Sequence, residues 1–209
     1  MDTTSVPDDL LVERSRSGDQ AAFNTLVERY QKPIYNLCLR MLGERQAAED
    51  AAQEAFISAY RHIAQLRGTN FRAWLFRIAT NACYDELRRR RPSRSYPIRP
   101  DQGPSDSDPS HPGLRSSQAL PLLTSTAVSP EAYAEQQEAF RHLQRALLIL
   151  PPEQRLLLVL CDAYGFSYEE AAQIAGLRVG TVKSRLSRGR ARLRGILRQW
   201  ELLPSQERL

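Results

Sequence analysis

The stretch that decides the fold is Ser167 to Arg198, SYEEAAQIAGLRVGTVKSRLSRGRARLRGILR. Ser167 can cap a first helix, and Glu170, three residues later, completes a capping box. Gly176 ends that helix, because the turn there needs a residue that tolerates positive φ. A second helix follows from about 179 to 200. The pattern therefore predicts two helices joined by a tight turn.

The predicted second helix has an apolar face and a basic face. Its apolar face, counted at 100° per residue, consists of Val182, Leu186, Gly189, Leu193, Ile196 and Leu197. Between 178 and 198 it carries eight basic residues and no acidic one. The alternative is a solvated charged face, but such faces usually mix both signs in i,i+4 pairs. The combination is typical of a helix-turn-helix whose second helix enters the DNA major groove.

Charge is concentrated in this helix rather than spread over the chain. The 209 residues carry 29 Lys+Arg against 24 Asp+Glu, a formal net charge of +5. The segment 178–198 alone contributes +8, whereas residues 1–91, with 14 basic and 12 acidic side chains, contribute +2. The local excess indicates a polyanionic partner.

Composition argues against several other classes of protein. No signal peptide, membrane span, nucleophile elbow, phosphate-binding glycine loop or zinc-protease motif is found, so we expect a cytoplasmic protein without catalysis of its own. The cysteines, which form no CxxC pair and no metal spacing with a histidine, are expected to be free thiols: Cys38, Cys83 and Cys161. We expect no metal and no cofactor.

The amino-terminal part is helical in pattern. Asp19 can cap a long helix that ends at Gly43, with Pro33 predicted to kink or break it. The next helix, 47–66, has an expected inner face of Ala52, Phe56, Ala59, Tyr60 and Ile63. Beside this face or outward lie Asp50, Gln53, Glu54 and Ile57, which by pattern alone are only a solvated surface.

A short loop, 67–70, precedes a helix over 71–91 that interleaves aromatic and arginine residues. Such a mixture suits single-stranded nucleic acid, because bases stack on rings while arginines meet phosphates. The alternative is a core helix whose rings pack inward, as we expect of Trp74, Ile78 and Cys83. Phe71, next to the loop, is expected to be exposed.

Residues 92–128 are predicted to be a flexible linker, since seven of the 37 are Pro and eight are Ser and no apolar periodicity is present. The fold class is therefore all-α, with two small helical domains, 8–91 and 129–201, each large enough for a three- or four-helix bundle. In the second, Ser129 and Pro130 are expected to begin the first helix, and Pro151 and Pro152 the next.

Two runs resemble the extracytoplasmic-function sigma factors of bacterial RNA polymerase. One, AEDAAQEAFISAYRHIAQLRGTNFRAWLFRIATNACYDELRRRRP, is similar to their region two. The other, LPPEQRLLLVLCDAYGFSYEEAAQIAGLRVGTVKSRLSRGRARLR, is similar to their region four. The resemblance covers about 8–91 and 129–198, in the family's order. It implies a factor that directs core RNA polymerase to promoter DNA, with an anti-sigma factor as a further partner.

The resemblance also implies roles for particular residues. It implies that the residues docking on core polymerase are Asp50, Gln53, Glu54 and Ile57. It implies that the residues recognising and melting the minus-ten element are Arg67, Gly68, Thr69, Asn70, Phe71, Arg77, Asn81 and Arg88. It implies that the residues recognising the minus-thirty-five element are Arg178, Thr181, Lys183, Ser184, Ser187 and Arg188. The 67–70 loop is one residue shorter than the commonest family form, and Ser187 stands where many members have a bulkier residue.

Two other functions remain open at this point. A helix-turn-helix activator that binds DNA without joining the polymerase would need only 129–201, and it leaves the arginine-rich 67–91 stretch unexplained. A nucleic-acid-modifying enzyme would need a metal or catalytic constellation, which the scattered histidines do not supply.

Overall fold

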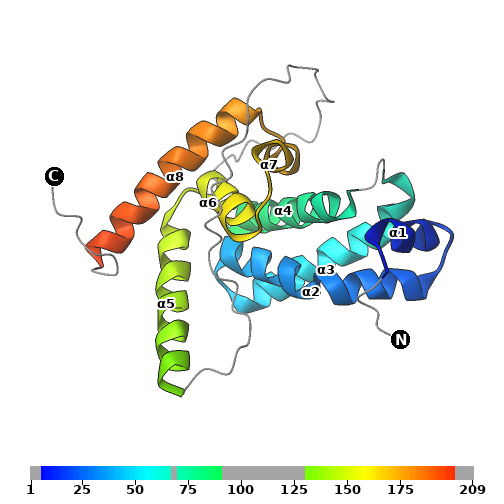
Figure 1. Cartoon of the computed structure of the whole chain (residues 1–209), viewed down its shortest axis with the longest axis horizontal. Coiled ribbons are helices and arrows are strands. Elements are labelled where there is room, and N and C mark those ends of the chain that lie inside the picture. The colour runs from blue at the N-terminus through cyan, green and yellow to red at the C-terminus, as the bar shows by residue number, and fades with distance from the viewer. Residues whose placement is uncertain (1–5, 67–69, 91–129, 201–209) are drawn as a thin grey trace.

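The structure is a computed structural model that describes residues 6–66, 70–90 and 130–200, with side chains from 137 onward in the last range. Every regular element among the described residues is a helix (Figure 1). The amino-terminal helices are α1 (Asp8–Arg16), α2 (Gln20–Leu42), α3 (Arg45–His62), the short η2 (Ile63–Gln65) and α4 (Phe71–Arg90). The carboxy-terminal helices are α5 (Pro130–Ile149), α6 (Pro152–Leu158), the π-helical turn η3 (Val159–Ala163), α7 (Tyr168–Ala175) and α8 (Val179–Gln199). The expected linker, the loop residues 67–69 and Ser129 lie outside the described residues.

The long helix α2 begins and ends as its sequence predicts, although its proline does not break it. Asp19 accepts a hydrogen bond from the backbone N–H of Ala22 at 3.1 Å, which satisfies one of the free donors of the first turn. Gly43 ends the helix at φ +77°, a conformation that favours glycine. The helix runs without interruption through Pro33, so the expected break is absent.

The inner face of α3 is built almost entirely from alanine. Its buried residues are Ala47, Ala48, Ala51, Ala52, Ala55 and Ala59, and small side chains of this kind let neighbouring helices approach closely. The expectation that Tyr60 faces inward is wrong, because its side chain is 48% exposed. Its ring instead meets the Phe23 ring edge-on, with centroids 5.0 Å apart, at the surface between α2 and α3.

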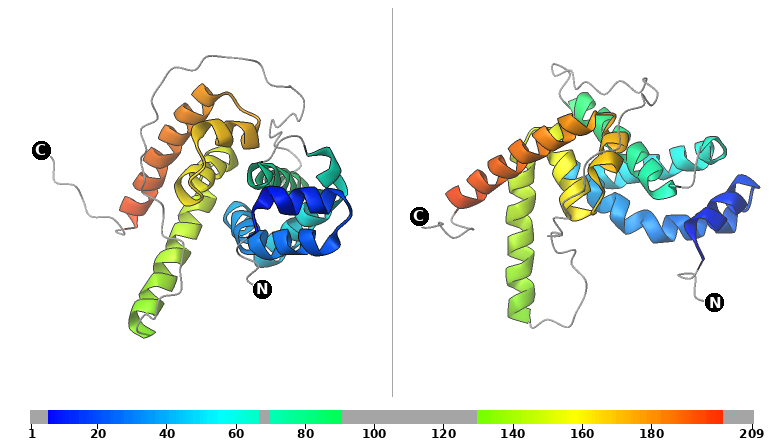
Figure 2. Two further views of the ribbon diagram at one scale, coloured as in Figure 1. Left: turned by 45° about the vertical axis from the view of Figure 1, so that its right-hand side comes forward. Right: turned by 45° about the horizontal axis from the view of Figure 1, so that its top comes forward.

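The helix α4 lies at the centre of the molecule. It packs against α2 and α3 on one side and against α7 on the other, as the two views of Figure 2 show. This double packing accounts for its long series of buried residues, Phe71, Ala73, Leu75, Phe76, Ala79, Thr80, Cys83 and Tyr84. The two expected domains therefore share one continuous apolar core in this structure.

The carboxy-terminal helices form the predicted helix-turn-helix. The Ser167 hydroxyl accepts from the Glu170 backbone N–H at 3.1 Å, and the Glu170 carboxylate accepts from the Ser167 N–H at 2.9 Å, which completes the capping box. Gly176 ends α7 at φ +64°. Val182, Leu186 and Gly189 of α8 are buried, as the apolar stripe predicts, and α8 packs on α6.

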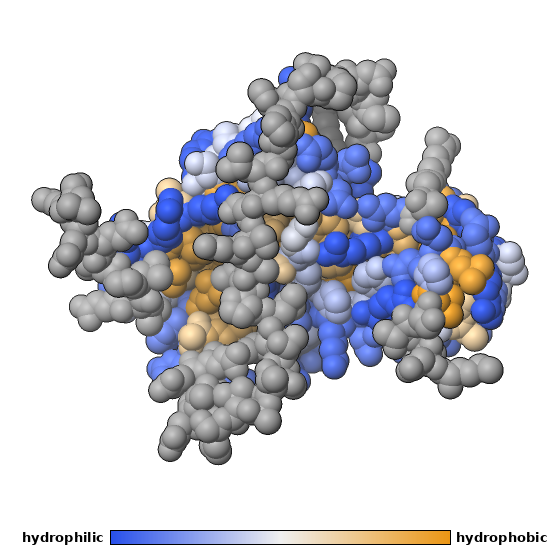
Figure 3. Space-filling model, in the orientation of Figure 1, coloured by the Kyte–Doolittle hydropathy of each residue, from blue (hydrophilic) through white to orange (hydrophobic). Residues whose placement is uncertain are grey.

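The outer surface is uneven in polarity. On the face shown in Figure 3, hydrophilic colour covers most of the middle of the molecule, and apolar colour gathers toward its two ends, on the α5–α8 side and the α1 side. Leu10 on α1, Ile149 at the end of α5 and Trp200 directly after α8 are exposed large apolar residues. Among the described residues, none of the helices has both the length and the hydropathy that crossing a bilayer requires.

Candidate nucleic-acid interface

The outward face of α8 carries the side chains predicted to read duplex DNA. Lys183, Ser184, Ser187 and Arg188 are exposed, as is Arg178 just before the helix, whereas Thr181 is half-buried. The Ser184 hydroxyl donates to the Thr181 carbonyl at 3.1 Å, and Arg188 Nε donates to the Ser184 carbonyl at 3.2 Å. These local bonds hold Arg188 along the helix surface, where its other guanidinium nitrogens are available for a base edge or a phosphate.

One basic residue of α8 has an internal structural partner. Arg190 donates to both carboxylate oxygens of Asp162, from Nε at 3.1 Å and from Nη2 at 2.5 Å. This hydrogen bond, together with the Asp162 charge and a bond to the Tyr168 hydroxyl, raises the pKa of Arg190 above its usual value. The pair joins α8 to η3 across 28 positions of sequence, so the helical pattern of 178–198 alone could not reveal it.

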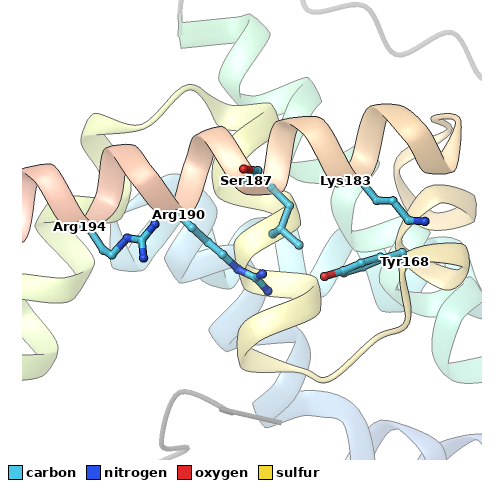
Figure 4. A pocket seen from close by; sticks show the side chains of 6 residues that line it. Tyr168, Lys183, Ser187, Arg190 and Arg194 are labelled. Carbon is cyan, nitrogen blue, oxygen red and sulfur yellow. The ribbon is translucent and has the colours of Figure 1, made fainter. Parts of the chain in front are cut away.

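Beside this pair lies a basic hollow, seen from close by in Figure 4. Its volume is about 340 Å³, and it is lined by Tyr168, Lys183, Leu186, Ser187, Arg190 and Arg194. Because Asp162 balances the charge of Arg190, the net positive charge of the hollow comes from Lys183 and Arg194. The hollow thus extends the exposed face of α8 that is predicted to read DNA toward the amino end of α7, and it offers two cations and two hydroxyls to an anion such as a phosphate.

A second candidate surface runs along α4. Asn70, Arg77, Asn81 and Arg88 lie within about 40° of one another around the helix axis. We call these four residues the α4 stripe. Asn70 and Asn81 are separated by about 16 Å along that axis, given a rise of 1.5 Å per residue. They can therefore contact different nucleotides of one extended strand, but they cannot form a single base pocket.

The structure corrects one residue of this predicted minus-ten set. Phe71 was expected to be exposed, yet its ring is 1% exposed and packs against Tyr30 and Trp74, with centroid distances of 5.5 and 5.9 Å. Trp74, expected to be buried, is half-buried on the same side of α4 as the stripe. The sequence could not settle which ring is exposed, because Phe71 closes the gap between α2 and α4 only in the folded chain.

The amino end of α4 is fixed by the loop that precedes it. Asn70 Oδ1 accepts from the Ala73 backbone N–H at 2.9 Å and so caps the helix. Along the stripe, Arg77 is exposed and Asn81 is half-buried, while Arg88 is paired with Asp85. Arg67, Gly68 and Thr69, also predicted to contact the minus-ten element, lie outside the described residues.

The predicted polymerase-docking group forms a separate surface on α3. Asp50, Gln53 and Glu54 are exposed, and Ile57 is 39% exposed, so the group presents an apolar side chain beside carboxylates. Asp50 and Glu54 also line a hollow of about 610 Å³ between α3 and the carboxy-terminal half of α4. Its other charged lining residues are Asp85, Glu86, Arg88 and Arg89. An exposed apolar side chain bordered by polar ones matches the arrangement of protein–protein interfaces, in which a polar rim surrounds an apolar centre.

Comparison with known proteins assigns the family. Residues 26–93 match Sigma-70 region 2, and residues 140–193 match Sigma-70, region 4. The chain is 36% identical over 188 residues to the ECF RNA polymerase sigma factor SigW of Bacillus subtilis, covering 90% of this chain and 95% of that protein. It is 36% identical over 184 residues to the ECF RNA polymerase sigma factor SigE of Mycolicibacterium smegmatis, covering 87% of this chain and 65% of that protein. The chain belongs to the ECF sigma factors of bacterial RNA polymerase.

Solved structures agree with this assignment. CnrH in complex with the cytosolic domain of CnrY superposes with a TM-score of 0.63 at 26% sequence identity, covering 92% of this chain and 97% of that one. The sigma factor RpoE of Bartonella quintana, in complex with the anti-sigma factor NepR, superposes with a TM-score of 0.58 at 27% identity, covering 84% and 96%. The all-helical architecture and the helix-turn-helix are thus confirmed.

Proposed function

We propose a two-part mechanism by which this sigma factor selects promoters. The module at 129–201 reads the minus-thirty-five duplex through α8, and the module at 8–91 binds core polymerase through α3 and the melted minus-ten strand through the α4 stripe. Residues 92–128 tether the two. One observation carries this proposal. A chain that matches both sigma regions has two separate exposed basic surfaces, the α8 face and the α4 stripe, and a third surface on α3 that is acidic and apolar.

The two DNA surfaces suit different forms of DNA. The α8 face is a single helix with exposed cations, which fits the width of the major groove. The α4 stripe alternates arginine and asparagine over a length of about 27 Å, from 18 residues at 1.5 Å each. Arginines of such a stripe neutralise phosphates, and asparagines offer donors and acceptors to the edges of unstacked bases.

A helix-turn-helix activator acting outside the polymerase would need only α7 and α8, whereas this chain also carries the region 2 helices. The α3 group separates the two functions. We propose that Gln53, Glu54 and Ile57 dock on core polymerase, since an activator has no need for an exposed isoleucine among carboxylates far from its DNA-reading helix.

The partners follow from these surfaces and from the relatives. CnrH and RpoE of B. quintana were each solved with a protein partner, CnrY and NepR respectively. We propose that this chain likewise binds core RNA polymerase, promoter DNA and an anti-sigma factor. We also propose that it works in the cytoplasm, without catalysis of its own.

The experiment that tests the proposed function is co-purification with core polymerase. Glu54→Lys combined with Gln53→Ala should abolish retention on immobilised core enzyme while helicity, measured by circular dichroism, stays unchanged. Glu28→Lys, which makes the same charge reversal at an exposed position of α2, is the control and should bind as the wild type does. Full retention of the double variant would remove α3 from the polymerase interface.

A further inference from the structure

Helix α1 lies at the end of the molecule where α3 ends and α4 begins, and it packs against α2, η2 and α4 (Figure 1). We propose that Arg16 and Tyr30 are positioning residues for minus-ten recognition. Arg16 holds Leu66, which lies before the residues predicted to contact the minus-ten element. Tyr30, itself held by α1, supports Phe71 at the start of α4. The inference rests on the proposed two-part function and adds to it two residues outside the predicted DNA surfaces.

Arg16, the last residue of α1, holds the turn η2. Its Nη2 donates to the Leu66 carbonyl, and its Nε lies 3.5 Å from the Ile63 carbonyl oxygen. Ile63 begins η2 and Leu66 directly follows it, and both residues are 5% exposed. One guanidinium can face two carbonyls because its N–H donors lie in a rigid plane. Arg16 therefore contacts both ends of the turn that leads out of α3.

The Leu66 carbonyl matters for the direction of the chain. The peptide group is planar, so the orientation of this carbonyl sets the direction in which the chain leaves η2. The Leu66 N–H donates to the Ile63 carbonyl at 3.2 Å, so the turn has a hydrogen bond of its own and Arg16 binds it from outside. Loss of the Arg16 contact should therefore redirect the chain that follows without unfolding the turn.

Tyr30 supports the chain on the other side. Its ring meets the Phe71 ring edge-on, with centroids 5.5 Å apart, and its hydroxyl donates to an Asp8 carboxylate oxygen in the first turn of α1. Arg29 donates to the other oxygen of this carboxylate, which fixes it from a second direction. Burial, together with the hydrogen bond to Asp8, raises the pKa of Tyr30, so the hydroxyl stays protonated and remains a donor.

The Tyr30–Phe71 contact fixes the first residue of the α4 stripe. Asn70 directly precedes Phe71, whose ring is 1% exposed. Asn70 Oδ1 also accepts from the Ala73 N–H at 2.9 Å, so Asn70 is joined to the first turn of α4. A shift of the Phe71 ring should therefore move Asn70 with it.

Neither positioning residue is placed to contact DNA itself. Tyr30 is 8% exposed. The third guanidinium nitrogen of Arg16, Nη1, donates to a Glu13 carboxylate oxygen at 2.9 Å, so each of the three nitrogens faces a protein oxygen. A residue that neutralises a phosphate changes the salt dependence of binding, whereas a residue that aims base contacts changes the sequence preference. The two roles can therefore be separated by experiment.

The test uses holoenzyme formed from core polymerase and the full chain, with a library of single-stranded oligonucleotides of random sequence. Sequencing of the retained strands gives the base preference at each position of the selected motif. Arg16→Ala and Arg16→Lys should both lower the preference at one position about fivefold or more, the discrimination that one good base contact supplies. Lysine keeps the charge but lacks the planar fork. Arg14→Ala, which removes the same charge and an ion pair with Asp19 from the same helix, is the control and should keep the wild-type preference.

Tyr30→Phe, which keeps the ring but loses the bond to Asp8, should lower the preference in the same part of the motif. Wild-type preference in this variant would overturn the role of Tyr30. For Arg16, the slope of log affinity against log salt should stay unchanged in Arg16→Ala. A slope reduced by about 0.7 would show that Arg16 neutralises a phosphate, and would overturn its positioning role. Wild-type preference in Arg16→Lys, or an equal loss at every position of the motif, would also overturn it. A wild-type holoenzyme without any sequence preference would instead overturn the proposed minus-ten function.

Discussion

Asp162 and Arg190 form an ion pair with two hydrogen bonds, which joins helix α8 to the π-helical turn η3. The guanidinium presents Nε and Nη2 in a plane to the two carboxylate oxygens, an arrangement that fixes direction as well as distance. The pair adds a directional contact to the packing of α8 on α6 and α7, and we expect it to restrict the rotation of α8 about its own axis.

Asp162→Asn should therefore weaken binding to the minus-thirty-five duplex at all sequences alike. The pair is partly exposed, so its loss should cost about 1 kcal/mol. The affinity ratio between the preferred and a substituted duplex should stay unchanged, as measured by fluorescence anisotropy at one salt concentration. Arg190→Lys, which keeps the charge but loses the planar fork, should behave like Asp162→Asn. Wild-type affinity for both variants would show that α8 is held by its apolar face alone.

Arg188→Ala should act differently, because Arg188 is exposed on the outward face of α8. A bidentate contact to a base is worth about 1–3 kcal/mol of discrimination. The variant should lose that discrimination at one base pair of the minus-thirty-five element, which a panel of single-base substitutions can measure. Arg198→Ala, with the same charge change about 15 Å further along the helix, should alter only the salt dependence. If substitutions at every base cost the Arg188 variant as much as the wild type, Arg188 is not a base reader.

The burial of Phe71 separates its role from that of Asn81. Asn81→Ala should reduce binding of the holoenzyme to a single-stranded minus-ten oligonucleotide by about 1 kcal/mol, a factor of about 5, with little effect on stability. Phe71→Ala should instead destabilise the chain by about 3–5 kcal/mol, because it removes a ring packed between α2 and α4. Urea unfolding and oligonucleotide binding measured side by side distinguish the two. A stable Phe71→Ala variant that no longer binds the strand would reinstate Phe71 as a stacking residue.

The cap of α2 predicts a pH dependence. The Ala22 backbone N–H and the Arg14 side chain, 2.7 Å away, lower the pKa of Asp19 below its ordinary value of 3.8. A lowered folded-state pKa stabilises the fold above 3.8, and this stabilisation is lost as the pH falls through the folded value. Asp19→Asn keeps the cap but not the charge. The melting temperature of wild type should exceed that of the variant at pH 7, and the difference should shrink below pH 3.8. A difference independent of pH would show that the charge of Asp19 contributes nothing.

Local signals predicted much of this fold because they act over a few residues. The Ser167–Glu170 capping box, the ends of α2 and α7 at Gly43 and Gly176, and the apolar stripe of α8 all depend on neighbouring positions. The helical periodicity of apolar residues also predicted which side chains are exposed, among them Asp50, Glu54, Lys183 and Arg188.

Features that depend on distant contacts could not be predicted in this way. Tyr60 is exposed because the buried face of α3 is filled by alanines, and Phe71 is buried because α2 lies over it. The Arg190–Asp162 pair and the Arg72–Phe166 contact join residues 28 and 94 positions apart. The single apolar core to which both parts of the described chain contribute depends on distant contacts of the same kind.

The central claim is that one chain uses both of its DNA surfaces to place core polymerase at promoters. The most direct measurement is transcription of fragmented genomic DNA by core polymerase with and without the chain, followed by sequencing of the transcript 5′ ends. The account predicts chain-dependent start sites that share two motifs, one about 10 and one about 35 base pairs upstream, separated by about 85 Å of B-form DNA. Start sites that do not depend on the chain, or that share only one of the two motifs, would contradict it.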